Sequence, residues 1–317
     1  MRPTPVEIEA PDISAYCDGN TGIPYVRTLE SGRAGPHAVI TSLVHGNELC
    51  GAWALTRLLQ CEDIRPKSGR LSLVFANTEA YQRFDPDQPR ATRYLDEDLN
   101  RVWDLSTLDG PRQSRELRRA RELRPLIEGA DWLLDLHSMQ LESPPLLLSG
   151  LGEKGRKLAA AMGYPALVVA DSGHRTGSRM RDFGAFADPA SDRTAMLVEC
   201  GQHWARDSVD VAIATCRRFL EAIDMVDPAS LDQFCPAPEL SPQRAVDVTD
   251  AITVGDGPFR FTGSFQGLEV ISEAGTVIAY DGATPIRTPY DDCVLIMPSR
   301  RLVSGLTAVR LGRFADQ

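Results

Sequence analysis

Five short apolar runs, each ending in a polar residue, place the strongest limit on how this 317-residue chain can fold. Helix-like stretches such as GNELCGAWALTRLLQ (46–60) and SVDVAIATCRRFLEAI (208–223) follow two of them, with apolar residues at helical spacing. Strands that alternate with helices predict an α/β fold, with a mostly parallel, mixed sheet and helices on both faces. The runs are HAVITSLVH, RLSLVFAN, DWLLDLH, ALVVAD and TAMLVE, which end at His45, Asn77, His137, Asp171 and Glu199.

The pattern changes towards the C-terminus. Residues 227–243 are rich in proline and lack periodicity, and from residue 244 onward short alternating stretches are broken by Gly, Pro and Asp. We therefore expect an α/β domain over 1–226, a Pro-rich linker over 227–243, and a small all-β C-terminal domain over 244–317.

Charge and cysteine usage narrow the class of protein. The net charge of −10 argues against a nucleic acid or an anionic membrane as partner, although local arginines can still bind a small anion. Seven scattered cysteines without a C-x-x-C pair fit a reduced compartment better than a disulfide framework. The N-terminus lacks a signal-like pattern, and no run reaches the ~18 apolar residues of a membrane span. We expect a soluble cytoplasmic protein, and a homo-oligomer would agree with base rates.

Polar residues at the ends of the apolar runs indicate a metal site. Ligands of an open parallel sheet bind beyond the carboxyl ends of its strands, where His45, His137 and Glu199 are expected to meet. Glu48, three residues after His45, lies in the first turn of the following helix. Two histidines and a carboxylate with a fourth position open are the ligands of a catalytic zinc. Taken alone, the H-x-x-E pattern more often marks a hydrogen-bonded turn than a metal site.

Asp135 precedes His137 by two residues, so both side chains project from the same side of a strand. Its carboxylate can orient the imidazole of His137 as a partner behind the metal. A buried salt bridge is an equally good explanation.

Four motifs together resemble the succinylglutamate desuccinylase/aspartoacylase family of the zinc carboxypeptidase clan. They occur in the family order and extend over nearly the whole chain: VHGNE (44–48), RYLDEDLNR (93–101), DLHS (135–138) and LVECG (197–201). The resemblance implies a zinc-carboxypeptidase-like fold, one Zn²⁺ per chain, and hydrolysis of the amide bond of an N-acylated amino acid or a related small acid. It assigns His45, Glu48 and His137 to the zinc and makes Glu199 the catalytic carboxylate.

The resemblance also gives roles to the second motif, whose arginines and asparagine line the family's substrate pocket. Glu199 would act as general base and then acid, and Arg93 would stabilise the developing oxyanion. Arg101, with Asn100 beside it, would bind a substrate carboxylate through its planar fork. Asp98 is expected to support one of these arginines.

Two further family positions have several candidates in this chain. An arginine before the catalytic glutamate binds substrate in the family, and here Arg179 and Arg181 are preferred over Arg175 and Arg193. A tyrosine of the C-terminal domain also reaches the substrate in the family, and either Tyr280 or Tyr290 can take that role. His37, His174 and His203 match no family position.

Two other functions remain open. A metallocarboxypeptidase acting on short peptides would use the same zinc and the same base. A dinucleotide-binding protein is suggested by GLGEKG, from Gly150 to Gly155, which satisfies G-x-G-x-x-G, follows an apolar run and precedes a helix-like stretch. Against the latter, this loop follows two strand–helix units instead of opening the domain, and the metal residues would have no role.

Overall fold

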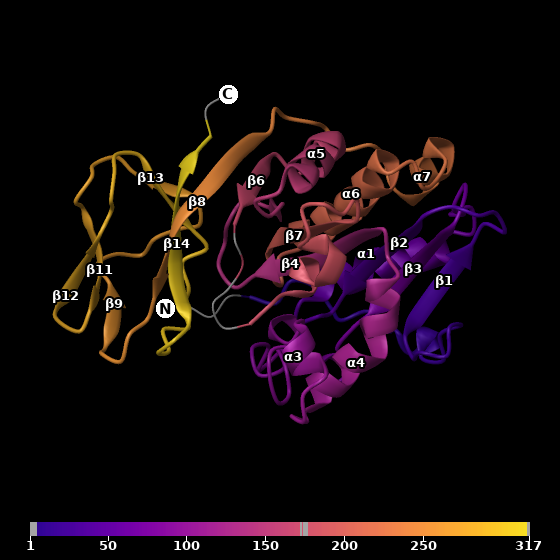
Figure 1. The fold of residues 1–317 in the computed structure, drawn as a ribbon, viewed down its shortest axis with the longest axis horizontal. Coiled ribbons are helices and arrows are strands. Elements are labelled where there is room, and N and C mark those ends of the chain that lie inside the picture. The colour runs from indigo at the N-terminus through magenta and orange to yellow at the C-terminus, as the bar shows by residue number, and fades with distance from the viewer. Residues whose placement is uncertain (1–4, 172, 174–176, 316–317) are drawn as a thin grey trace.

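The structure is a computed structural model that describes residues 5–171, 173 and 177–315. Within these residues, a sheet of eleven strands runs through most of the molecule (Figure 1). In spatial order its strands are β1 (Val26–Glu30), β3 (Arg70–Phe75), β2 (His37–Ser42), β4 (Trp132–Met139), β7 (Thr194–Gln202), β5 (Leu146–Leu148), β6 (Leu167–Ala170), β8 (Arg244–Thr253), β14 (Thr307–Phe314), β13 (Cys293–Ile296) and β10 (Glu269–Ile271).

The centre of the sheet is parallel and its flanks are mixed. Strands β3, β2, β4 and β7 run in the same direction, whereas β1 and β5 are antiparallel to their neighbours β3 and β7. All five apolar runs singled out in the sequence supply strands of this sheet. The register of the β4–β7 pair places His137 opposite Glu199. The predicted α/β class with a mixed, largely parallel sheet is confirmed.

Helices cover both faces of the sheet, as predicted. Successive strand residues point to opposite faces, and the core accordingly divides in two. Ile40 and Leu134 pack in a cluster with α1 and α6, while their neighbours Val39 and Leu133 pack with α4 on the other face. In Figure 1, α3 and α4 lie below the sheet and α5, α6 and α7 above it. The helices are α1 (Leu49–Gln60), α2 (Thr78–Tyr81), α3 (Leu105–Leu108), α4 (Arg115–Glu128), α5 (Glu153–Met162), α6 (Asp207–Ala222) and α7 (Pro228–Phe234).

The stretch expected to be a linker contains helix α7. Pro228 occupies its first position, where a missing N–H costs nothing. Leu231 and Phe234 of this helix are buried in the main core. The proline content that suggested a linker therefore marks, in part, the start of a short packed helix.

The C-terminal strands extend the main sheet and also form a sheet of their own. Strand β8 pairs in parallel with β6 and antiparallel with β14, so the large sheet continues past the expected boundary near residue 244. A separate three-stranded sheet consists of β12 (Thr284–Arg287), β11 (Val277–Asp281) and β9 (Phe259–Phe261). The division of the chain into domains stays a prediction. Among the described residues, the helices are all too short or too polar to cross a lipid bilayer.

Candidate active site

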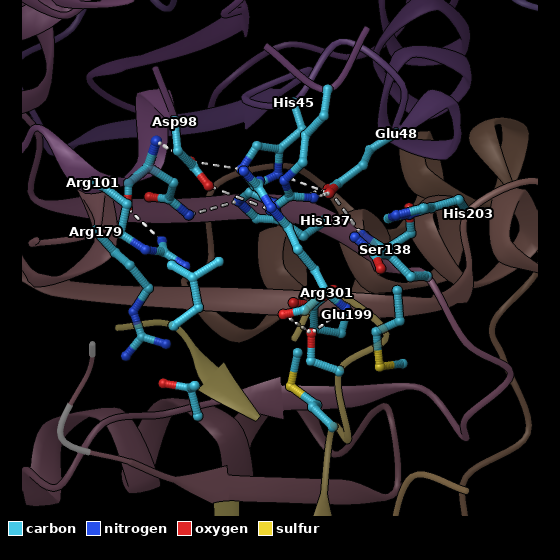
Figure 2. Close-up of a pocket in the computed structure, with 18 of the residues that line it drawn as sticks. His45, Glu48, Asp98, Arg101, His137, Ser138, Arg179, Glu199, His203 and Arg301 are labelled. Carbon is cyan, nitrogen blue, oxygen red and sulfur yellow. Dashed lines mark hydrogen bonds and ion pairs between the residues drawn. The ribbon is translucent and has the colours of Figure 1, made fainter. Parts of the chain in front are cut away.

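A cavity of about 500 Å³ opens beyond the carboxyl ends of β4 and β7 and is closed on one side by the C-terminal strands. His45, Glu48 and His137 are called the histidine–glutamate group below. Figure 2 shows Asp98, Arg101 and Arg179 on one side of this group, with Ser138 and His203 on the other. Most of the residues expected at the site line this cavity. They are His45, Glu48, Arg93, Asp98, Asn100, Arg101, His137, Arg179 and Glu199.

His45 lies in the turn between β2 and α1, shortly after the last strand residue, Ser42. The turn is tight, because a Cβ atom at Gly46 would lie 2.6 Å from backbone atoms of neighbouring segments. The amide of Gly46 also donates to the carbonyl of Arg93 at 3.0 Å, which ties this turn to the stretch RYLDEDLNR (93–101). Glu48 directly precedes helix α1 and points back towards His45.

Three buried side chains, two from the turn between β2 and α1 and one from β4, converge on one point. Nδ1 of His45 lies 2.7 Å from Oε1 of Glu48, and Nδ1 of His137 lies 2.9 Å from Oε2 of the same carboxylate. One ligand atom from each of the three residues lies within 4.8 Å of the other two. This spacing suits a single small cation among two imidazoles and a carboxylate.

Both imidazoles are oriented through their other nitrogen. Nε2 of His45 lies 2.9 Å from Asp98 Oδ1, and Nε2 of His137 lies 2.9 Å from Asp135 Oδ2. A carboxylate behind each ring fixes its orientation and can accept a proton from Nε2, so that Nδ1 faces Glu48 and can offer its electron pair to a metal. Without a metal, burial would lower the pKa of His137, but Asp135 and Glu48 outweigh this effect and raise the pKa well above its ordinary value. Asp98 thus contacts a histidine as well as Arg93, whose Nη2 lies 3.6 Å from Asp98 Oδ2.

The electrostatics of the group favour an ionised Glu48. Burial alone would raise its pKa, but the nearby His45 and His137 outweigh this effect and hold the pKa of Glu48 well below its ordinary value. The backbone amide of Ser138 adds a hydrogen bond to Oε2 at 3.1 Å. A permanently charged carboxylate beside two oriented imidazoles fits a zinc ion by donor type, charge and geometry.

Glu199 faces the same cavity in a different environment. It projects from β7, is 8% exposed, and its Oε2 atom has no hydrogen-bond partner among the described residues. Burial raises the pKa of Glu199 to about 8; His137 and Arg93 oppose this rise, and Glu48 adds to it. A carboxylate with a raised pKa and an unoccupied oxygen is suited to accept and release a proton near neutral pH.

Arg93, the first residue of the stretch RYLDEDLNR (93–101), contacts Glu48 and His45 of the histidine–glutamate group. Its Nη1 donates to Glu48 Oε1 at 3.0 Å, and its Nη2 lies 2.9 Å from His45 Nε2. Burial would lower the pKa of Arg93, but Asp98 and then Glu48 and Glu199 raise it overall. The guanidinium therefore keeps its charge at the centre of the cavity.

Asn100 and Arg101 occupy the flank of the cavity next to His137. Asn100 Nδ2 lies 3.3 Å from His137 Nε2, and its Oδ1 accepts from the amide of Met180 at 2.9 Å. Arg101 Nη1 donates to the carbonyl of Asn100 at 2.6 Å, and no carboxylate of the described residues lies within ion-pair distance of it. Burial lowers the pKa of Arg101 to about 10, with Arg93 and Arg179 among the cations that add to the effect. An anion bound here would relieve that repulsion.

Of the two arginines preferred for the position before Glu199, the fold places one at the cavity and the other away from it. Arg179 lines the cavity, but its guanidinium is paired with Asp171 at 2.5 Å and with Asp182 at 2.8 Å. Arg181 does not line the cavity, since it turns towards Asp182 and donates from Nε to the carbonyl of Leu148 at 3.0 Å.

The two less favoured arginines do not add to the site. Arg193 lies at the opposite end of β7, near Asp131. Arg175 lies outside the described residues, as does His174.

The C-terminal region reaches the cavity through residues other than the expected tyrosines. Tyr280 lies under the guanidinium of Arg260, and the Tyr290 hydroxyl lies 2.5 Å from Thr249 Oγ1; neither tyrosine lines the cavity. The residues that do so include Arg301, which donates to the Tyr94 hydroxyl at 2.7 Å, and Arg310 on β14, whose Nε lies 3.4 Å from Asp171 Oδ2.

His203 also lines the cavity, although no sequence pattern pointed to it. It follows β7, and its Nδ1 lies 2.8 Å from the hydroxyl of Ser138. Burial lowers the pKa of His203 to about 3, so the ring is neutral at physiological pH. Its closeness to Glu199 in the chain is the one signal that could have drawn attention to it.

The glycine-rich loop has the expected strand–loop–helix context but is already occupied. Gly150 has a φ of 71°, and the guanidinium of Arg181 fills the space above it, 2.0 Å from the position of a Cβ atom. A dinucleotide site of this kind also needs an acidic residue about 20 positions further on for the ribose; Asp171 has that position, but it is paired with Arg179. The geometry therefore gives no support to a dinucleotide site.

Comparison with known proteins decides the family. A model of the succinylglutamate desuccinylase/aspartoacylase catalytic domain matches residues 34–223, more than half of the chain and all four motifs. This protein belongs to the succinylglutamate desuccinylase/aspartoacylase family. The resemblance seen in the sequence is thereby confirmed.

Individual relatives of this family member match over shorter stretches. The N-acyl-aromatic-L-amino acid amidohydrolase (carboxylate-forming) of Rattus norvegicus is 30% identical over 124 residues, which are 36% of this chain and 37% of that protein. A probable aspartoacylase of Parasynechococcus marenigrum (strain WH8102) is 36% identical over 80 residues, 25% of this chain and 24% of that protein. The matches thus span about a quarter of one of these relatives and little more than a third of the other.

Solved structures extend the likeness to the whole fold. The crystal structure of succinylglutamate desuccinylase from Vibrio cholerae superposes with a TM-score of 0.69 over 92% of this chain and 86% of its own. Sequence identity between the two is 19%, so this likeness speaks for the fold alone.

Proposed function

We propose that the protein is a zinc-dependent amidohydrolase that removes the acyl group from an N-acylated amino acid or a related small acid. One observation carries the proposal: two oriented imidazoles and the Glu48 carboxylate converge beside a buried glutamate, Glu199, that has a free oxygen. The first group has the donors of a catalytic zinc, and the second has the properties of a proton carrier. The amidohydrolase and aspartoacylase names of the relatives support the same reaction class.

The zinc would be held by His45, Glu48 and His137, and when bound it supplies a Lewis acid for the acyl carbonyl and lowers the pKa of water to roughly 7. Glu199 takes the proton of the attacking water and later delivers it to the departing amine nitrogen. Arg93 keeps a positive charge beside the position where the carbonyl oxygen becomes negative.

Substrate orientation would come from the arginine flank of the cavity. The Arg101 fork is not paired with a protein carboxylate among the described residues, and it can bind a substrate carboxylate through two hydrogen bonds. Asn100 lies between Arg101 and His137, at the junction of the binding flank and the reaction centre. Other cavity walls are apolar, with Met139, Leu148 and Leu197 among the lining residues, and can accommodate an apolar part of the substrate.

The partner would be a small molecule in the cytoplasm, rather than a nucleic acid or a membrane. The net charge of −10 and the seven free cysteines support this proposal. The contact between Arg301 and Tyr94 beside the cavity favours short substrates over peptides. Turnover of N-acyl amino acids in preference to dipeptides and tripeptides would separate a deacylase from a metallocarboxypeptidase.

Metal content and activity measured together test the proposal. We expect about one zinc per chain in protein loaded with zinc and desalted, and hydrolysis of N-acyl amino acids that a chelator abolishes and added zinc restores. The double variant His45→Ala/Glu48→Ala should lose the zinc and the activity. Zinc-replete wild type that hydrolyses no N-acyl amino acid or peptide would reject the hydrolase assignment, and absence of zinc from both proteins would reject the metal site.

Removal of Arg101 should weaken substrate binding more than catalysis. Because its guanidinium contacts the substrate carboxylate in both the ground state and the transition state, Arg101→Ala should raise KM about 10–100-fold, the equivalent of ~1.5–3 kcal/mol for hydrogen bonds to a charged group. Initial rates with an N-acyl amino acid and with its carboxamide analogue check this. For the carboxamide analogue, KM should be nearly the same in the variant and the wild type, because the analogue has no carboxylate for Arg101 to bind. An unchanged KM for the N-acyl amino acid itself would show that Arg101 is not part of the binding site.

A further inference from the structure

Glu116 is a glutamate on the apolar face of helix α4. Leu117, Ala120, Leu123 and Ile127 of the same helix are buried against the sheet, and the Glu116 side chain is buried with them at 0% exposure. A carboxylate in such a position costs several kcal/mol unless hydrogen bonds replace its water. The stability of this arrangement therefore depends on the hydrogen bonds that the Glu116 carboxylate accepts.

The carboxylate of Glu116 accepts four hydrogen bonds from outside its helix. Oε1 accepts from the backbone amide of Leu95 at 2.7 Å and from Asn77 Nδ2 at 3.1 Å. Oε2 accepts from the amides of Asp96 at 3.0 Å and Glu97 at 3.3 Å. Three consecutive amides of one loop thus point at one buried carboxylate, which fixes the path of that loop.

The loop lies directly between two residues of the active site. Arg93 precedes it and Asp98 follows it, and both reach Nε2 of His45, each at 2.9 Å. The N-terminus of α4 adds a second tie, because the amide of Arg115 donates to Asp96 Oδ2 at 2.8 Å. Any shift of the loop would therefore move both partners of the His45 imidazole.

We propose that Glu116 is a positioning residue of the active site. Its carboxylate holds the loop so that Asp98 keeps Nδ1 of His45 directed towards Glu48 and Arg93 stays over the reaction centre. The part of this proposal that concerns Arg93 rests on the proposed function. The part that concerns His45 depends only on metal binding. Glu116 touches neither the substrate nor the metal ligands and acts through the loop.

Glu116→Gln tests the proposal with little change in volume. The variant has one acceptor oxygen where the native residue has two, and its NH₂ group faces amide donors. We expect hydrogen exchange of the Leu95–Glu97 amides to become at least tenfold faster. Zinc affinity, measured by competition with a chelating dye, should fall about 10–100-fold, as for other groups that orient metal ligands, and kcat should fall similarly.

A double-mutant cycle separates positioning from simple loss of stability. In the Asp98→Asn background, Glu116→Gln should have a much smaller further effect on zinc affinity, because both changes act on the same imidazole. Glu122→Gln, an exposed glutamate on the same helix that pairs with Arg119, is the matched control and should leave all readouts unchanged. If Glu116→Gln does not fold, Glu116→Asp, which keeps both oxygens but draws them back, is measured in the same way.

The outcomes are distinct. Faster exchange with weaker zinc binding and a non-additive cycle supports the proposal, even if the wild type hydrolyses no amide and the proposed function fails. A lower Tm with unchanged zinc affinity and unchanged kcat overturns it, since Glu116 would then be a structural residue only. Additive effects of Glu116→Gln and Asp98→Asn on zinc affinity also overturn it.

Discussion

Glu199→Gln should lower kcat by about 10²–10⁴-fold while the zinc content stays at one per chain, because the change removes a proton carrier and no metal ligand. The side chain keeps its size, and Oε2 has no hydrogen-bond partner among the described residues, so the fold loses little. Burial raises the pKa of Glu199 to about 8, which brings its uptake and release of a proton close to neutral pH. The measurement is steady-state kinetics with N-acyl amino acids, beside metal analysis of the same sample.

Glu153→Gln is the control for this experiment. Glu153 is exposed on α5 and pairs with Lys157, so the loss of one negative charge there should leave kcat within about twofold of wild type. Loss of zinc from Glu199→Gln would instead make Glu199 a ligand. An undiminished kcat would assign the proton transfer to another group.

Asp171→Asn should be the most destabilising single change considered. Asp171 is 3% exposed and pairs with Arg179 at 2.5 Å and with Arg310 at 3.4 Å. The variant leaves buried guanidinium charge without its main counter-ion, a defect that costs about 3 kcal/mol or more in comparable pairs. We expect the Tm to fall by roughly 5–10 °C. Asp247→Asn removes an exposed partner of Arg156 on the neighbouring strand and should change stability by less than ~1 kcal/mol.

The same pair has a defined pH dependence. Burial would raise the pKa of Asp171, but Arg179 and then Arg310 outweigh it and hold the pKa well below its ordinary value. A depressed pKa stabilises the fold above the unfolded-state pKa, ~3.9, and the stabilisation is lost as the pH falls below it. Urea unfolding from pH 8 to 3 should therefore show a constant gap between wild type and Asp171→Asn down to about pH 5, which narrows at lower pH. A constant gap throughout would contradict the assignment.

The α/β fold and the centre of the site could be predicted because their signals are local. Each parallel strand is a short apolar run, and parallel strands present their carboxyl ends at one edge. His137 and Glu199, far apart in the chain, meet there in register. Glu48 could be predicted from its separation of three residues from His45 alone.

The rest of the site depends on contacts between distant segments. Arg301 and Arg310 reach the cavity because β8 pairs with β6 and brings the later strands with it, and nothing in the C-terminal sequence encodes that partner. Tyr280 and Tyr290 resemble the family's tyrosine by residue type, yet each is held elsewhere in the C-terminal region.

The positions of Arg179 and Arg181 depend on partners elsewhere in the fold, and the sequence does not show which residues these partners are. Asp171 and Asp182 draw Arg179 into a buried network, while the carbonyl of Leu148 holds Arg181 over the glycine loop. Glu116 carried a sequence signal that was overlooked, namely an acidic residue within the apolar stripe of a helix.

The parallel pairing of β6 with β8 has a consequence for dissecting the protein. A chain ending at Gln243 would lack β8; β6 would stay paired with β5, but the backbone N–H and C=O groups on its other side would have no partners. Such an open edge is a template for self-association. The N-terminal part would also lose the wall of its cavity that carries Arg310. The C-terminal strands therefore cover an edge of the large sheet as well as shaping the pocket.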